Sequence, residues 1–555
     1  MRYVFFVLCA LLIGPLHAAE LRQPLPSTYA IVDVRIVPAP GEVLESATIV
    51  VRDGIIEAVG SDIEPPPDAA LVTFERGSEN DEDQPPITVY AGLIDPYLAV
   101  ASDENSDGGG NDNGNGDDED GGSVPGRHPL IRPDRRLDPA AWPADTVEAH
   151  RRAGFTTALM APAVGLLRGN SVLANLGDGG MSANLLAENV AQHAHLDERS
   201  PDGNYPQSLM GSVALFRQSL LDAAWQQSAR NAWQANPAQS RPEWLAGMDV
   251  LAPVLAGEQP LVVKSEDALD SLRILDLVDG EIDLVLVGHG EEYKRLDDFD
   301  RKVPHILPLD FPAAPDVEAE NDGHDNRDAS LEELRHWKYA PENPARLVEA
   351  GFPVLLTAHG QSNPEDLFGQ VAKAVEHGLD ADAALAALTT GPAEWLGIAD
   401  RAGRIAAGYM ANLVIVDGEL FGEETTINEV WVDGHRFELT RLVPPEVDPA
   451  GTWDLTLGLA GMGDVDATLK LSGEPANMDG ILMVMGNETP LSEARVSGKR
   501  LQVRIDAARF GEAGTITINM DIDGDRGRGN GSGPFGEFTV RGTRSSGPGD
   551  EETRI

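Results

Sequence analysis

Five short apolar runs in the middle of the chain alternate with stretches of helical periodicity, and this alternation restricts the fold more than any other feature. The runs are rich in β-branched residues and lie at 154–162, 259–265, 282–290, 303–312 and 351–360. Continuous apolar strands separated by helices are typical of a parallel sheet whose faces are covered by helices. The middle of the chain is therefore predicted to be an α/β unit.

One of the intervening helices can be assigned in detail. Asn363 is the expected N-cap, Pro364 occupies the first helical position and Gly378 ends the helix. His377 falls in the last turn, where the helix dipole stabilises a cation. A capping role is therefore preferred for His377 over a catalytic one.

Both flanks of the α/β unit show the pattern of β structure. Apolar and polar residues alternate from Tyr29 to Gly60, and an Asp-Gly pair at 53–54 predicts a tight turn. Beyond Gly397 the same pattern returns, with a second Asp-Gly pair at 433–434. The chain is therefore expected to return to its first β unit.

A further β region follows, and it is expected to be a separate C-terminal all-β domain, a sandwich or a barrel, at 447–545 with a frayed tail at 546–555. The region contains evenly spaced alternating segments. The Gly-rich stretch 529–536 is interpreted as a flexible turn between two of them.

One short acidic motif in this region has the spacing of a calcium loop. Asp521, Asp523 and Asp525 alternate, but Arg526 stands where the sharp turn of such a loop needs glycine. A polar hairpin is the preferred interpretation.

The first residues have the features of a secretory signal peptide, assigned to 1–19. Arg2 is followed by an apolar run and by small residues at 18–19, and the run is shorter than the roughly 20 residues of a membrane span. Cys9, the one cysteine, lies inside this segment, so the mature chain is expected to have no disulfide and no thiolate metal site. The expected location is periplasmic or secreted, without a membrane span after cleavage.

The chain is strongly acidic, with 91 Asp and Glu against 42 Lys and Arg and a formal net charge of −49. A phosphate backbone would be repelled by such a surface, so a nucleic-acid partner is excluded. Part of the charge lies in 102–122, which lacks the apolar residues of a folded segment and is expected to be a disordered acidic loop.

Two segments carry a resemblance to a known family. "AGLIDPYLAV" at 91–100 and "LTTGPAEWLGIADRAGRIAAGYMANLVIVDGELF" at 388–421 resemble motifs of the amidohydrolase superfamily, and 205–225 and 335–351 are similar to its imidazolonepropionase-like secreted subgroup. The resemblance implies an α/β fold with a TIM-type (β/α)8 barrel at 89–396. It also implies a flanking β-sandwich made from both chain ends, 20–88 and 397–442.

This family uses one or two divalent metals, usually zinc, that lower the pKa of a bound water and polarise the scissile carbonyl. Its ligands lie at the carboxyl ends of barrel strands. At the positions that match, this chain has mostly residues that cannot bind zinc: Tyr97, Ala99, Lys264 and Ala358, with His289 the one clear ligand retained. The metal site is therefore predicted to be degenerate, and no cofactor is expected although zinc is usual in the family.

A pair of histidines is the first candidate for a replacement site. His193 and His195 form the one His-x-His motif, but the surrounding sequence is typical of a helix end or loop, so a paired surface histidine is preferred over a metal pair.

A second group consists of residues that follow predicted strands and can converge at the barrel mouth: His289, Lys264, His359 and Tyr97. A metal-free hydrolase with His289 as base is one interpretation of this cluster. The other is that each residue is a satisfied polar group at a strand end.

Two functions follow from these observations. The first is a secreted hydrolase of C–N bonds in non-peptide or cyclic amides, as the resemblance implies. The second is a non-catalytic barrel that binds a small-molecule ligand or serves as a partner of an active amidohydrolase paralogue. Because function depends on the site more than on the fold, the second is preferred for the mechanism.

Overall fold

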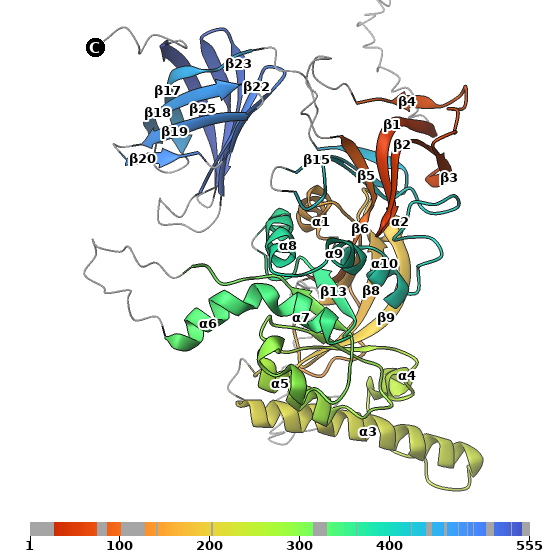
Figure 1. Ribbon diagram of the computed structural model, residues 1–555. Coiled ribbons are helices and arrows are strands. Elements are labelled where there is room, and N and C mark those ends of the chain that lie inside the picture. The colour runs from red at the N-terminus through yellow and green to blue at the C-terminus, as the bar shows by residue number, and fades with distance from the viewer. Residues whose placement is uncertain are drawn as a thin grey trace, which may run out of the picture.

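The computed structural model of the chain is drawn in Figure 1. The described residues are 27–74, 86–100, 128–139, 142–200, 204–314, 330–361, 363–422, 425–439, 447–459, 463–474, 477–484, 487–491, 493–506, 515–533 and 536–546. The predicted signal peptide, Cys9, the acidic loop at 102–122 and nearly all of the predicted tail lie outside them. Within the described residues, no helix has both the length and the apolarity needed to cross a membrane.

Strands from both chain ends form one eight-stranded sheet, in the order β16-β15-β14-β5-β1-β2-β3 with β4 paired to β1. Antiparallel pairing of β5 with β14 joins the two ends, so the predicted return to the first β unit is confirmed. The strands are β1 (Thr28–Ala39), β2 (Glu42–Arg52), β3 (Ile55–Gly60), β4 (Ala70–Val72), β5 (Ile87–Ala91), β14 (Leu413–Asp417), β15 (Thr426–Val432) and β16 (His435–Glu438).

A second eight-stranded sheet forms a nearly closed barrel in the order β13-β12-β11-β10-β9-β8-β7-β6, with β13 beside β6. The chain passes into it from the first sheet at Gly92, between β5 and β6. The barrel strands are β6 (Leu93–Val100), β7 (Phe155–Pro162), β8 (Leu167–Asn175), β9 (Leu185–His195), β10 (Leu261–Lys264), β11 (Leu284–Val287), β12 (His305–Pro308) and β13 (Val354–Thr357).

The barrel departs from the expected set of eight parallel strands at β8, which runs antiparallel to both β7 and β9. Only residues 163–166 connect β7 to β8. A parallel crossover needs a dozen or more residues, so this short connection forces the chain to turn back. The α/β class is retained, but the all-parallel expectation is wrong for this strand.

Helices surround the barrel (Figure 1). They are α1 (Ala144–Arg152), α2 (Met181–Asn184), α3 (Leu209–Ala235), α4 (Ala252–Leu255), α5 (Ala268–Leu277), α6 (Leu331–Tyr339), α7 (Asn343–Glu349), α8 (Leu367–Glu376), α9 (Ala381–Leu388) and α10 (Thr390–Trp395). Short 3-10 helices are η2 (Met248–Leu251), η3 (Glu292–Lys294), η4 (Leu296–Asp298), η6 (Ala340–Glu342) and η7 (Pro364–Asp366).

The helix predicted after Asn363 is present as η7 followed by α8. The Asn363 side chain accepts a hydrogen bond from the Glu365 backbone N–H, as the predicted N-cap should. His377 follows the last residue of α8, and its Nδ1 lies 2.8 Å from the carbonyl oxygen of Lys373. Its position at the helix end agrees with the predicted capping role.

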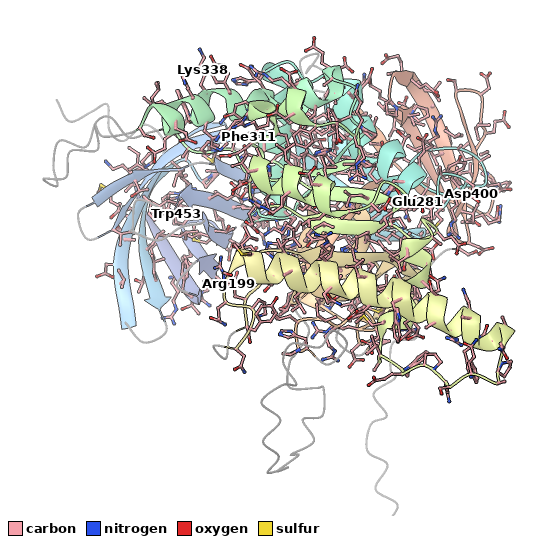
Figure 2. The ribbon with its side chains drawn as sticks, turned by 90° about the horizontal axis from the view of Figure 1, so that it is seen from below. Arg199, Glu281, Phe311, Lys338, Asp400 and Trp453 are labelled. Atoms are coloured by element: carbon pink, nitrogen blue, oxygen red, sulfur yellow. The ribbon has the colours of Figure 1, made fainter. Side chains whose placement is uncertain are left out.

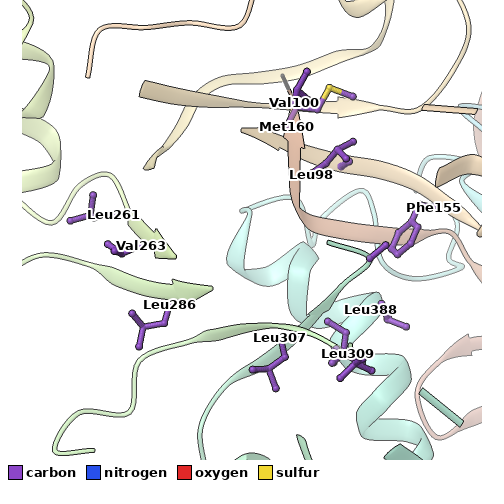
Figure 3. Packing of buried hydrophobic residues seen from close by; sticks show 14 of the residues in the cluster. Leu98, Val100, Phe155, Met160, Leu261, Val263, Leu286, Leu307, Leu309 and Leu388 are labelled. Carbon is purple, nitrogen blue, oxygen red and sulfur yellow. The ribbon is translucent and has the colours of Figure 1, made fainter. Parts of the chain in front are cut away.

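Apolar side chains fill both faces of the barrel sheet. The outer face, between strands and helices, is packed by residues such as Phe155, Leu261, Leu286 and Leu388 (Figure 3). The inner face carries a separate cluster with Tyr97, Ala161, Ala191, Val262, Val285, Val287, Ile306 and Leu355. This inner cluster identifies the residues of each strand that point into the barrel.

The C-terminal region forms a nine-stranded antiparallel sheet in the order β20-β19-β18-β17-β25-β24-β23-β22-β21. Because β21 also lies beside β19, the sheet curls toward closure. Its strands are β17 (Gly451–Leu459), β18 (Gly463–Glu474), β19 (Asn477–Val484), β20 (Asn487–Pro490), β21 (Glu493–Ser497), β22 (Arg500–Asp506), β23 (Thr515–Asp523), β24 (Arg526–Gly533) and β25 (Gly536–Ser546).

One prediction in this region is confirmed and another is wrong. β23 and β24 form the hairpin expected at Asp523, with Asp523 paired to Arg526. The stretch 529–536 is mostly strand rather than a flexible turn. A Cβ at Gly529 would lie 1.8 Å from the backbone oxygen of Asn519, so this glycine permits close strand contact within the sheet.

Candidate functional site

Polar side chains gather at the carboxyl ends of several barrel strands. In the pairing of β9 with β10, His193 lies opposite Val262 and His195 opposite Lys264. Val262 belongs to the inner cluster, and alternate residues of a strand share a face. His193, His195 and Lys264 therefore lie on the inner face, as does Tyr97.

The interpretation of His193 and His195 as a surface pair at a helix end or in a loop is wrong. Both belong to β9, and they are 1% and 8% exposed. The first half of β9 is largely exposed, and a polar segment follows the strand directly, so the apolar signal of a buried strand is weak here. The i, i+2 spacing of Ala191, His193 and His195 was the signal that could have identified the strand.

A buried guanidinium makes hydrogen bonds to several residues at this end of the barrel. Arg168, on β8, is 5% exposed, and its Nη1 donates to the hydroxyl of Tyr97 at 3.0 Å. Its Nη2 donates to His195 Nδ1 and to Glu198 Oε1, each at 2.9 Å. Its Nε donates to the backbone oxygen of Gly165 at 3.1 Å. One cation thus connects residues from three different strands.

A second carboxylate, that of Glu266, balances the positive charge of Lys264. Glu266 Oε1 lies 2.9 Å from Lys264 Nζ and 2.6 Å from His195 Nε2. Burial raises the pKa of Glu266, but its hydrogen bond and charge interaction with Lys264 lower it more, so the net shift is downward. Arg168 and Lys264 are therefore matched by the two anions Glu198 and Glu266.

Asp95 connects the first and last barrel strands, β6 and β13, by a hydrogen bond. It is fully buried, and its Oδ1 accepts hydrogen bonds from the Thr357 hydroxyl at 2.6 Å and the Tyr97 N–H at 2.9 Å. Burial raises its pKa, but interactions with His150, 3.5 Å away, and the Thr357 bond outweigh burial and lower the pKa overall. Asp95 is thus an ionised structural acceptor, with its oxygens occupied by protein donors.

Two imidazoles in this region are held neutral. Burial and then the nearby Arg168 charge lower the pKa of His193 to about 3, and neither of its ring nitrogens has a partner among the described residues. Burial and then Lys264 lower the pKa of His359, whose ring lies 4.9 Å from that of Tyr97. Both rings are uncharged at neutral pH.

His289 lies in a different cluster. It follows β11, and its Nε2 is 3.4 Å from the hydroxyl of Ser271 on α5 and 3.6 Å from Glu292 Oε1. Glu292 is fully buried; burial raises its pKa, but the charges of His289 and His305 lower it overall. The ring of His289 is thus held by groups outside the barrel interior.

The predicted cluster is therefore only partly assembled. The structure brings Tyr97, Lys264 and His359 to the mouth, and it places His289 apart from them. The sequence analysis missed Arg168, Glu198 and Glu266, which complete the network. Arg168 lies on the antiparallel strand β8, whose existence was not predicted.

Comparisons with known proteins agree with this architecture. Residues 342–437 match the sequence profile of the Amidohydrolase family. The solved structure of an amidohydrolase from Thermotoga maritima MSB8 superposes with a TM-score of 0.56 at 21% identity, covering 74% of this chain and 100% of that one. The fold is that of the amidohydrolases.

Two further matches are weaker or cover less of the chain. Amidohydrolase tasK of Hapsidospora irregularis is 35% identical over 82 residues, which is 15% of this chain. The chain thus spans 8% of the length of this curated relative. A Xaa-Pro dipeptidase structure with bound methionine has a TM-score of 0.41 at 15% identity, covering 74% of this chain and 100% of that one.

The amidohydrolase family generally uses metals, and several residues at this mouth offer no ligand for a zinc ion. Ala99 and Ala358 offer no donor atom, and the Tyr97 hydroxyl is bonded to a guanidinium. Glu198 and Glu266 approach opposite nitrogens of His195, so they cannot converge with it on one ion. In the part of the chain that the structure describes, no group of three or more His, Cys, Asp or Glu residues is arranged to hold a metal.

Proposed function

We propose that this chain is an exported protein that uses the amidohydrolase scaffold without metal-dependent hydrolysis. It works as a non-catalytic subunit that binds a small-molecule ligand or an active amidohydrolase paralogue. The export part of the proposal rests on the predicted signal peptide at 1–19.

The observation that carries the proposal is the position of Arg168. Its guanidinium donates hydrogen bonds to Tyr97, at a position that the resemblance assigns to a metal ligand, and to His195 at the end of the strand next to its own. A fixed cation at this point satisfies the polar groups that a metal would otherwise bind, and it repels a divalent ion. On this proposal the mouth needs no metal, and no metal-bound water is available for hydrolysis.

The proposal is tested by hydrolysis assays on the purified mature chain with a panel of linear and cyclic amides. We expect no hydrolysis that a chelator abolishes and none that added zinc induces. The Arg168→Met variant, which removes the internal cation, should not gain zinc-dependent activity either, because the missing ligands are not restored. Chelator-sensitive hydrolysis by the wild-type chain would contradict the proposal.

A second candidate is metal-independent hydrolysis of a C–N bond, which the position of His359 favours. Its neutral ring stands next to the Tyr97 ring at the mouth, so it can act as a general base at neutral pH. His289, the base considered from the sequence, is held elsewhere by Ser271 and Glu292.

Substitution of His359 and His289 distinguishes metal-independent hydrolysis from the non-catalytic function. If it is right, His359→Gln abolishes a chelator-resistant hydrolysis and His289→Gln retains it at the wild-type rate. Because the His359 pKa lies below its usual range, that activity should also persist below pH 6.5. Absence of any hydrolysis by the wild-type chain removes this candidate.

A further inference from the structure

We propose that the exposed face of α3 is a self-association surface, on which a second copy of this chain packs its own α3 in antiparallel orientation. The 27-residue helix contacts the rest of the protein along one face of its first part, where residues such as Phe216, Leu220 and Ala223 are buried. After Gln226 no residue of α3 is buried. The distal end of the helix projects beyond the neighbouring elements (Figures 1 and 2).

A second stripe runs along the opposite side of α3. Its members recur at intervals of three and four residues, which places them on one helix face. All are exposed, and they are Met210, Ala214, Arg217, Leu221, Trp225, Ser228 and Ala232. Met210 is 82% exposed, Leu221 56% and Trp225 52%. An apolar stripe on each side of a helix is typical of a helix with two packing partners.

The stripe is symmetric about Leu221. Met210 and Ala232 lie equally far from it along the chain, as do Ala214 and Ser228, and as do Arg217 and Trp225. An isologous interface needs a self-complementary surface, in which residue i of one copy meets residue j of the other and the reverse. An antiparallel pair with its two-fold axis at Leu221 meets that requirement.

In such a pair, a cation of one copy faces an aromatic ring of the other copy on both sides of the two-fold axis. Arg217 of one copy faces Trp225 of the other, so two cation–π contacts form across the axis. Within the described part of the chain, Arg217 has no ion-pair partner and Trp225 has no cation over its ring, so both are available. Trp233 and Trp244 are instead covered by Arg241 and Arg230 of the same protomer.

Charge favours this surface for contact between two acidic copies. The segment 209–244 has Arg217, Arg230 and Arg241 against Asp222 and Glu243, which is 3 − 2 = +1, while the whole chain carries −49. Two copies repel each other over most of their surfaces. The α3 region is a place where they can approach without an excess of carboxylates.

The size of this surface determines how tightly the two copies are expected to bind. The stripe from Met210 to Ala232 covers about 33 Å of helix at about 1.5 Å per residue. Two helices packed over that length, with Trp225 from each copy, reach the lower part of the range for stable interfaces, about 1,200 Å² in total. We therefore expect a dimer that dissociates on dilution.

The position of the two-fold axis is tested by cysteine cross-linking. The mature chain is expected to lack cysteine, so Leu221→Cys places one thiol per copy on the axis. Mild oxidation should convert this variant to a disulfide-linked dimer. Gln227→Cys, an exposed position on the same helix but off the stripe, should remain monomeric on denaturing gels. Equal cross-linking of both variants would overturn the proposal.

Sedimentation equilibrium of the full mature chain tests the interface itself. Leu221→Glu places two carboxylates face to face and should weaken the dimer by more than roughly a hundredfold. Gln227→Glu adds the same charge outside the stripe and should leave the dimer unchanged. Equal thermal midpoints of the two variants show that both fold.

Two outcomes contradict the proposal. If the wild-type chain stays monomeric at all concentrations, the stripe does not bind a second copy. A dimer that persists in Leu221→Glu is held by another surface.

Discussion

At the scale of single residues, Arg168 is a buried cation of the barrel mouth. Its guanidinium donates hydrogen bonds to Tyr97, His195 and Glu198. The buried charge is compensated by Glu198, so removing it leaves that carboxylate without its guanidinium partner.

Substitution of Arg168 by methionine tests this role. Breaking a buried ion-pair network by removing one partner costs about 3–5 kcal/mol, and we expect a loss of this size in the free energy of unfolding, measured with urea. Arg199→Met is the matched control, because Arg199 is exposed and its ion pair is with Asp197, at 2.7 Å. It should cost under about 1 kcal/mol. Similar losses for both variants would show that Arg168 is not a structural centre.

His193 predicts a pH dependence of stability. Its pKa is about 3 in the folded chain, against an ordinary value of 6.5. Between these values the unfolded chain binds a proton that the folded chain does not, so stability falls as the pH drops below 6.5. The contribution is up to about 1.4 kcal/mol per pH unit.

The His193→Phe variant should therefore lose stability less steeply than the wild type between pH 6 and pH 4, measured by urea unfolding at each pH. His377→Gln, at an exposed helix end, should keep the wild-type slope. A slope unchanged in His193→Phe would mean that the imidazole is charged in the folded protein.

At the scale of secondary structure, the sequence predicted best the elements whose neighbours lie close along the chain. The capped helix after Asn363 and the hairpin at Asp523 are local, and both are confirmed. β8 and β9 were missed because their pairing, not their composition, makes them barrel strands. The error at 529–536 has the same cause, since glycines interpreted as a turn are strand residues that allow a partner strand to approach.

Gly92 lies at the junction between the sheet formed from both chain ends and the barrel, and its substitution should change the stability of the protein. A Cβ at this position would lie 2.3 Å from Thr156 Oγ1 on β7, so Gly92→Ala should destabilise by about 1–3 kcal/mol through overpacking. A Cβ at Gly369, inside α8, would meet no atom within 4 Å, so Gly369→Ala should stabilise by up to about 1 kcal/mol. Thermal midpoints that move in the same direction for both variants would refute this account.

At the scale of the whole molecule, the fold was more predictable than the site. The return of the chain to its first β unit and the α/β barrel follow from patterns that can be read in order along the sequence. The mouth combines residues as distant as Asp95 and Thr357, and its central cation comes from an unpredicted strand. Tyr97, Lys264 and His359 could be placed there because each follows a recognised strand, whereas the direction of the His289 ring depends on Ser271 and Glu292.

The C-terminal sheet has its own apolar core around Trp453, separate from the cores of the barrel and of the sheet formed from both chain ends. One contact to the barrel is the ion pair between Arg504 and Glu365 at 3.4 Å. We expect residues 447–546 expressed alone to unfold cooperatively, with Trp453 fluorescence reporting the transition. A fragment without a cooperative transition would show that this sheet needs the rest of the chain.

The central claim is that the barrel mouth is complete without a metal, and the most direct test is the zinc content of the chain. Protein purified without chelator from zinc-supplemented cells, washed free of loosely bound ions and analysed by mass spectrometry, should contain far less than one zinc per chain. One or two tightly held zinc ions per chain would contradict the account, because Arg168 and its partners could not then occupy the mouth as described.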